Sequence, residues 1–161
     1  MSEKTAVEYA RSVIVNGLIC DVEKHIKNDA KQKAAASILT LGVYRATEAV
    51  PLLVKHIDFS PLGIDAGRPY RLSESVPCVY ALGKIGGRQC HDAMLDLVAK
   101  SGTYDNILSA KIVLTMSLGH DDAVALIQSR AAREKDRVKA RHLSALAKSI
   151  EMDSPSTSDD D

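Results

Sequence analysis

The sequence predicts an all-α protein, an α-solenoid of about four antiparallel helical hairpins, and three observations support this. Apolar residues recur every three to four positions, which is the period of one face of an α-helix. The strict alternation typical of a β-strand is absent. One sequence pattern occurs three times: an apolar stretch ends in Leu-Gly and is followed by a second apolar helix. Its glycines are Gly42, Gly83 and Gly119. Such repetition indicates stacked helical hairpins, which usually bind partners and do not catalyse reactions.

Helix ends in this sequence are marked mainly by glycine. Helices are expected over residues 3–15, 18–27, 30–41, 46–57, 73–83, 89–101, 105–118, 122–133 and 137–150. Gly17, Gly42, Gly83 and Gly119 each end one of them, because glycine adopts the left-handed conformation of a helix C-cap at little cost. Asp105 is expected to cap the seventh helix at its N-terminus.

The segment 58–72 interrupts this order, because its two prolines and two glycines exclude a continuous helix. Loops of more than about a dozen residues inside a domain are usually functional or disordered. Arg68, Tyr70 and Arg71 are candidate binding residues here, since arginine and tyrosine are enriched at interface hot spots. The alternative is that Phe59 and its apolar neighbours fill a gap between repeats, and both interpretations can hold together.

Composition narrows the class of protein. The 161 residues carry 21 basic and 21 acidic side chains, so no net charge steers the whole molecule toward nucleic acid or a membrane surface. No apolar run is long enough to span a membrane, and the N-terminus lacks the apolar core of a signal peptide. Three cysteines without CxxC spacing suggest reduced thiols and a cytoplasmic protein. We expect one domain over 1–150 and a disordered acidic tail over 151–161.

Two runs carry a resemblance to a known family. The run Ala-Leu-Gly-Lys-Ile-Gly at 81–86 and the run Glu-Ala-Val-Pro-Leu-Leu at 48–53 resemble the HEAT-like repeats of the bilin-lyase type. The resemblance extends over about 30–133, although the Asp-Val-Arg that such repeats often carry is missing and 58–72 is longer than their usual turn. It implies an α-solenoid that recognises other macromolecules, and it allows a second role as an accessory in bilin attachment or removal.

Basic side chains gather near the C-terminal ends of the expected second helices. They are Lys24, Lys55, His56, Lys100 and Arg130. One interpretation is that they only complement the helix dipole, which favours bases at this end. The other follows from solenoid geometry, in which second helices line the concave face, so these bases would form a ladder that pairs with acidic side chains of a partner.

Catalytic and metal sites are not expected. Cys90-His91-Asp92 and His120-Asp121-Asp122 lack the paired short spacing of zinc ligands, and N-capping by Asp92 and Asp121 explains them better. Cysteines 78 and 90 are expected to be core thiols. The sequence therefore indicates no enzyme, no metal and no other cofactor.

The last helix is strongly basic, with Arg137, Lys139, Arg141 and Lys148. It could bind nucleic acid through phosphates, but a polar end-cap of the solenoid is favoured because interleaved aromatic residues are absent. The acidic tail could also fold back onto it. We therefore predict a protein-binding scaffold with an unknown protein partner, possible homodimerisation at an apolar end of the solenoid, and no membrane contact.

Overall fold

The computed structural model describes residues 3–61 and 71–153, and every regular element within these two ranges is a helix. The α-helices are α1 (Glu3–Lys27), α2 (Lys31–Val43), α3 (Val50–Lys55), α4 (Leu72–Ser75), α5 (Pro77–Ile85), α6 (Gly87–Lys100), α7 (Tyr104–Leu118), α8 (His120–Arg133) and α9 (Arg137–Glu151). A short 3₁₀-helix, η1 (Thr47–Ala49), precedes α3. The prediction of an all-α protein is confirmed for the described residues.

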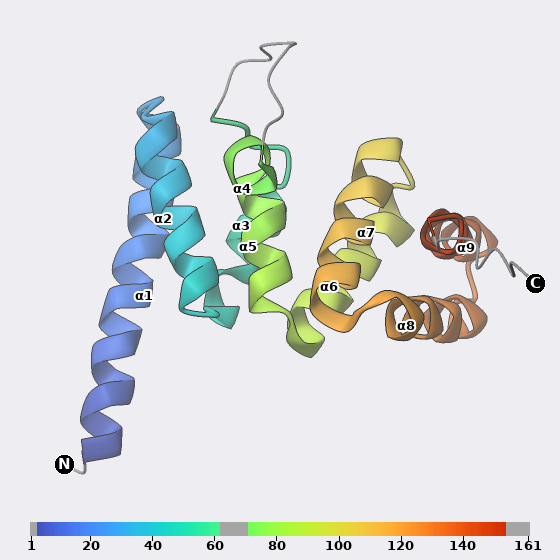
Figure 1. The fold of residues 1–161 in the computed structure, drawn as a ribbon, viewed down its shortest axis with the longest axis horizontal. Coiled ribbons are helices and arrows are strands. Elements are labelled where there is room, and N and C mark those ends of the chain that lie inside the picture. The colour runs from blue at the N-terminus through green and yellow to red at the C-terminus, as the bar shows by residue number, and fades with distance from the viewer. Residues whose placement is uncertain (1–2, 62–70, 154–161) are drawn as a thin grey trace, which may run out of the picture.

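The helices follow one another along the long axis of the molecule in chain order, from α1 at one end to α9 at the other (Figure 1). Helix α2 packs between α1 and α5, and α5 packs in turn against α7. Helix α3 packs against α5 and α6. Helix α9 contacts α6, α7 and α8, so the last helix joins three elements at the C-terminal end of the molecule.

The core is aliphatic and runs through the whole row of helices. Its largest fully buried side chains include Ile38, Leu41, Leu53, Leu82, Met94, Leu95, Leu114, Ile127, Leu143, Leu146 and Ile150. These residues belong to one continuous cluster, so neighbouring helices cover one another's apolar faces. Phe59 is partly buried and packs against this cluster, as expected if the start of the 58–72 segment fills a gap.

Helix α1 corrects the prediction that Gly17 separates two helices. The helix is continuous from Glu3 to Lys27, so the first of the expected hairpins is not formed. A glycine inside a helix costs only about 1 kcal/mol relative to alanine. Val15 and Val22 are fully buried on the side that faces the core, and their burial outweighs that cost.

Gly42 and Gly83 also lie inside helices, which corrects the prediction that they are helix ends. Each provides space for a neighbouring helix. A Cβ atom at Gly42 would lie 3.0 Å from the Cα atom of Ala81 on α5, and one at Gly83 would lie 2.9 Å from the sulfur of Met116 on α7. Only Gly119 ends its helix as predicted, with a positive φ of 83°.

Two other helix boundaries differ from the prediction. The expected helix over 73–83 is divided into α4 and α5 at Val76, because Pro77 disfavours helical backbone at the residue before it. Asp105 does not cap α7, since the hydroxyl of Thr103 accepts the hydrogen bond from the backbone N–H of Asn106. Asp105 lies in the first turn, where its negative charge complements the helix dipole.

Candidate functional site

A groove of about 520 Å³ lies between α6 and α8 in the described part of the surface. Residues of α6, α8 and the end of α7 line it: Arg88, His91, Asp92, Leu118, Asp122, Leu126 and Arg133. Leu118 and Leu126 are partly buried and pack against the core, so they give the groove an apolar lining. Charged side chains of both signs surround these leucines, an arrangement typical of protein-binding surfaces. We refer to this hollow as the α6–α8 groove.

The charges along α6 lie on one side of the helix at a spacing of four residues. Arg88 Nε lies 3.5 Å from Asp92 Oδ2, while the Arg88 side chain stays 95% exposed. The next residue of the series, Asp96, accepts a hydrogen bond of 2.7 Å from Arg130 of α8. This ion pair joins the two helices that form the groove. The charge of Arg130 is therefore already paired with Asp96 of the same chain.

Arg133 supplies the basic charge of α8 in the groove. Its Nε donates a 3.1 Å hydrogen bond to the backbone carbonyl of Ser129, one turn earlier. Among the described residues, no carboxylate forms an ion pair with Arg133. Its guanidinium group has five N–H donors, so most of them remain for a ligand in the groove.

His91 is a buried polar residue beside the groove, and its hydrogen bonds define its charge state. Its Nε2 lies 2.9 Å from the hydroxyl of Ser117, and that hydroxyl donates to the backbone carbonyl of Val113. Because Ser117 has only one proton to donate, Nε2 of His91 must be the donor in their contact. Burial lowers the pKa of His91, and the nearby Asp92 opposes this only in part, so the imidazole is neutral at pH 7.

A pH series should show this burial as a loss of stability in acid. Since the pKa of His91 is lower in the folded protein, the unfolded chain binds the proton more readily as the pH falls below about 6.5. The free energy of unfolding should therefore decrease between pH 7 and pH 5 in wild type, and His91→Gln should reduce this slope. Urea denaturation at several pH values measures both.

His120 provides the opposite control for this series. Hydrogen bonds to Asp121 and to the carbonyl of Ile150 raise its pKa, so its stabilising contribution is present in acid and is lost as the pH rises through the raised value. His120→Gln should change the slope on the alkaline side and leave the acid side intact. Identical pH profiles for wild type and the two variants would contradict both assignments.

The basic ladder expected from the sequence is placed on several different helices. Lys24 is exposed in the last turn of α1, not at the end of a separate second helix. Lys55 is exposed at the end of α3 and is followed by the half-buried His56. Lys100 is exposed at the end of α6, which packs against α3. Lys55 and Lys100 are thus at the C-terminal ends of two helices that pack together.

The candidate loop is described only at its two ends. Arg68 and Tyr70 lie outside the described residues. Arg71 is exposed, and its backbone carbonyl accepts a 2.9 Å hydrogen bond from the N–H of Glu74 at the start of α4.

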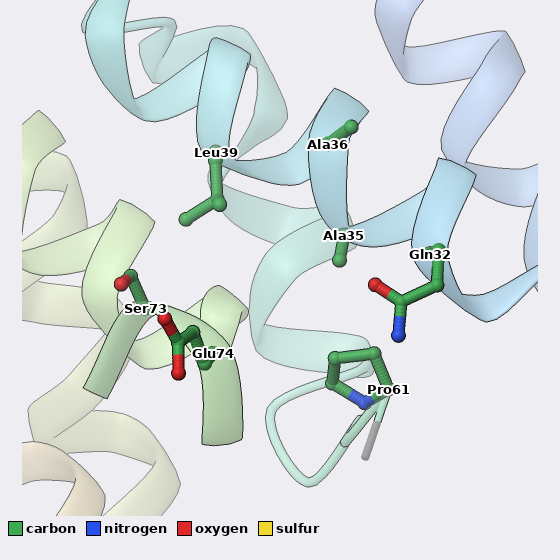
Figure 2. Close-up of a pocket in the computed structure, with 7 residues that line it drawn as sticks. All are labelled: Gln32, Ala35, Ala36, Leu39, Pro61, Ser73 and Glu74. Atoms are coloured by element: carbon green, nitrogen blue, oxygen red, sulfur yellow. The ribbon is translucent and has the colours of Figure 1, made fainter. Parts of the chain in front are cut away.

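A second pocket, of about 410 Å³, lies beside the two ends of this segment. Its lining comes from α2, the first turn of α4 and one buried proline: Gln32, Ala35, Ala36, Leu39, Ser73, Glu74 and Pro61. In Figure 2 the side chain of Gln32 extends toward Pro61, and Ser73 and Glu74 lie across the pocket from Gln32. The pocket is mostly apolar and has one carboxylate at its rim, so it is less charged than the α6–α8 groove.

Cys78 and Cys90 are buried, whereas Cys20 is exposed. Burial raises the pKa of Cys78 to about 12 and that of Cys90 to about 11, so both are protonated and unreactive at neutral pH. In the parts of the chain that are described, no three histidine, cysteine or acidic side chains are placed to hold a metal ion. Nor is any of the described helices both long and apolar enough to pass through a membrane.

The expected caps of α6 and α8 are wrong. Gly86 and Gly119 occupy the N-cap positions, and glycine has no side chain that could cap a helix. Asp92 lies one turn inside α6 and pairs with Arg88. Asp121 lies in the first turn of α8 and contacts the ring of His120.

Comparison of this chain with protein-family models, with curated proteins and with solved structures gives no match. The resemblance to HEAT-like repeats therefore rests on the residues that carry it. Of the groove residues, His91 and Asp92 form part of a motif that N-capping by Asp92 was expected to explain better than metal binding, and Arg88 and Arg133 were not among the predicted binding residues. The spacing of Arg88, Asp92 and Asp96 could have indicated a charged face on α6.

Proposed function

We propose that this protein is a non-catalytic interaction scaffold, an α-solenoid of HEAT-like repeats that binds a segment of another protein in the α6–α8 groove. One observation carries the proposal: two leucines line this hollow of about 520 Å³, and four charged side chains line it beside them. Apolar side chains of a partner would contact Leu118 and Leu126. The charged rim would then fix the orientation of the bound segment.

The chemistry of the groove suggests what the partner segment carries. Arg133 has donors to spare and Arg88 is almost fully exposed, so both can reach acidic side chains of a partner. An amphipathic helix with one apolar face and flanking Asp or Glu residues would satisfy both requirements. Lys55 and Lys100 could extend the basic surface beyond the groove, and Arg71 could add a contact beside the second pocket.

Charge reversal at the groove tests the proposal. The chain is immobilised and used for affinity capture from native lysate, and the captured proteins are identified by quantitative mass spectrometry. Their affinity is then measured with purified components. Arg88→Glu combined with Arg133→Glu should weaken binding by roughly tenfold or more, because two favourable charge contacts become repulsive.

The matched control reverses two charges on another surface, with Arg137→Glu and Lys139→Glu on the exposed face of α9. This variant should bind the protein partner as wild type does. Equal loss of binding in both double variants, or none in either, would contradict a site in the groove. Circular dichroism of both variants checks that helical content is unchanged.

Nucleic-acid binding through α9 is a second candidate, favoured by one observation. The exposed face of α9 carries Arg137, Lys139, Arg141 and Lys148. A gel shift with duplex DNA at low salt tests it, and the α9 double variant should abolish any shift. The bilin role that the resemblance allows is tested by the absorbance spectrum after mixing the protein with free bilin.

A further inference from the structure

We propose that the outer face of α1 is a self-association surface, which pairs with α1 of a second copy of this chain. Among the described elements, helix α1 packs mainly against α2, with fewer contacts to η1, and a large part of its other side is exposed. Val15 and Val22 mark the covered side, since both are fully buried. The proposal does not depend on the function of the α6–α8 groove.

The uncovered side of α1 is apolar. Val7 is 64% exposed, Tyr9 66%, Val13 54% and Ile14 44%. Small residues at the spacing of one helix face lie among them: Ala6, Ala10 and Gly17. A Cβ atom added at Gly17 would meet nothing within 4 Å. This group of residues is called the α1 stripe below.

The α1 stripe is also free of charge. Residues 5–20 contain only two charged side chains, Glu8 and Arg11. By helical geometry, both lie toward the side of Val15: Glu8 is about half a turn and Arg11 about a third of a turn away from Ala10 and Gly17. Arg11 donates a 2.8 Å hydrogen bond to Glu48 of η1, which fixes it on the covered side.

The two terminal helices, α1 and α9, differ in how polar their outer faces are. At the C-terminal end, α9 buries Leu143, Leu146 and Ile150 and turns its basic face outward. A terminal helix of a stacked fold needs such a polar outer face to stay soluble. On the outer face of α1, charge is confined to the C-terminal part, at Asp21 and Lys24, and residues 6–17 of that face are uncharged.

A second copy is the occupant that this chemistry favours. In a two-fold symmetric contact a surface faces itself, so every charge near the axis would face a like charge. The α1 stripe avoids this repulsion because it carries no charge. Its small residues also allow close approach of two helices, as Gly42 of α2 does against Ala81 of α5. The N-terminal part of α1 extends beyond α2, so α2 does not block it (Figure 1).

The size of the surface sets the expected strength. An apolar patch of this kind covers on the order of 400 Å², so two copies would bury on the order of 800 Å² in total. This is below the size of a standard stable interface, and we expect a dimer that forms and dissociates with protein concentration.

Sedimentation velocity over a range of protein concentrations tests the proposal. Wild type should shift from monomer to dimer as the concentration rises. Val13→Glu should weaken dimerisation by roughly tenfold or more, because it would bury an unpaired charge in the contact. The matched control is Ser12→Glu, which adds the same charge one position away on a different side of α1 and should dimerise as wild type does. Ala10→Glu is a second stripe variant in case Val13→Glu folds poorly.

Cys20 provides an independent measurement, because it is exposed and lies on the side of the stripe, whereas Cys78 and Cys90 are buried. Its reaction with a thiol reagent should slow at concentrations where the dimer forms, and it should not slow in Val13→Glu. A wild-type chain that stays monomeric at all concentrations would overturn the proposal. Equal dimerisation of Val13→Glu and Ser12→Glu would overturn it as well.

Discussion

Replacing Gly42 with leucine should lower the free energy of unfolding by about 3 kcal/mol, because there is no room for a side chain between α2 and α5 at this position. A Cβ atom here would lie 3.0 Å from the Cα atom of Ala81 and 3.2 Å from its Cβ atom. The nearest of these atoms is backbone in the middle of α5, so it cannot move unless the helix moves. Leucine would force α2 and α5 apart and disturb the core that they share.

Gly17→Ala is the matched control, since it changes another glycine inside a helix. Nothing lies within 4 Å of a Cβ atom at Gly17, so the variant gains helix propensity at no steric cost. Its free energy of unfolding should rise by about 1 kcal/mol. Urea denaturation at low protein concentration measures both variants. A stability loss at Gly17 equal to that at Gly42 would show that helix packing is not the cause.

Leu82→Ala should cost about 3 kcal/mol of stability, the typical loss for a buried leucine. Leu82 is 0% exposed and belongs to α5, which packs between α2 and α7 in the middle of the row of helices. Shortening it leaves a cavity among helices that are fixed by contacts on both sides, so the site can collapse only in part.

The control for this substitution is Leu72→Ala in α4, where the leucine is 42% exposed. An exposed position of this kind usually changes stability by about 0.5 kcal/mol or less. Urea denaturation compares the two midpoints and slopes. Similar losses for both variants would mean that Leu82 is not a central core residue.

Much of the fold can be predicted from the sequence because the period of apolar residues reports directly on helices. The all-α class and the approximate position of most helices follow from this period. The expectation that glycine ends a helix was wrong at Gly17 because the burial of Val15 and Val22 favours one continuous helix. It was wrong at Gly42 and Gly83 because glycine, which can end a helix, also allows helices to pack closely. Only the contact with Ala81 or Met116 distinguishes these two uses, and no local pattern reports a contact between helices.

The candidate groove was harder to predict, because its residues come from three helices. Arg88 and Arg133 are separated by 45 positions in the sequence, and no local pattern indicates that they line the same groove. The ladder of basic residues was inferred by aligning the C-terminal ends of the expected helices. Such an alignment gives the position of a residue along its helix but does not show whether its charge is already paired within the chain. Arg130 illustrates the difference, since Asp96 of α6 already holds it.

Helix α9 has a consequence for how the protein is made. Three polar contacts fasten it to different helices: Lys111 of α7 binds the carbonyl of Ser149, His120 of α8 binds that of Ile150, and His142 of α9 binds that of Ala99 on α6. Lys111 also pairs with Asp153, close to the end of the described chain. During translation α9 emerges after the three helices that it fastens. Helices α6, α7 and α8 therefore lack these contacts until α9 has been synthesised, and a stop codon before α9 would produce a chain without them.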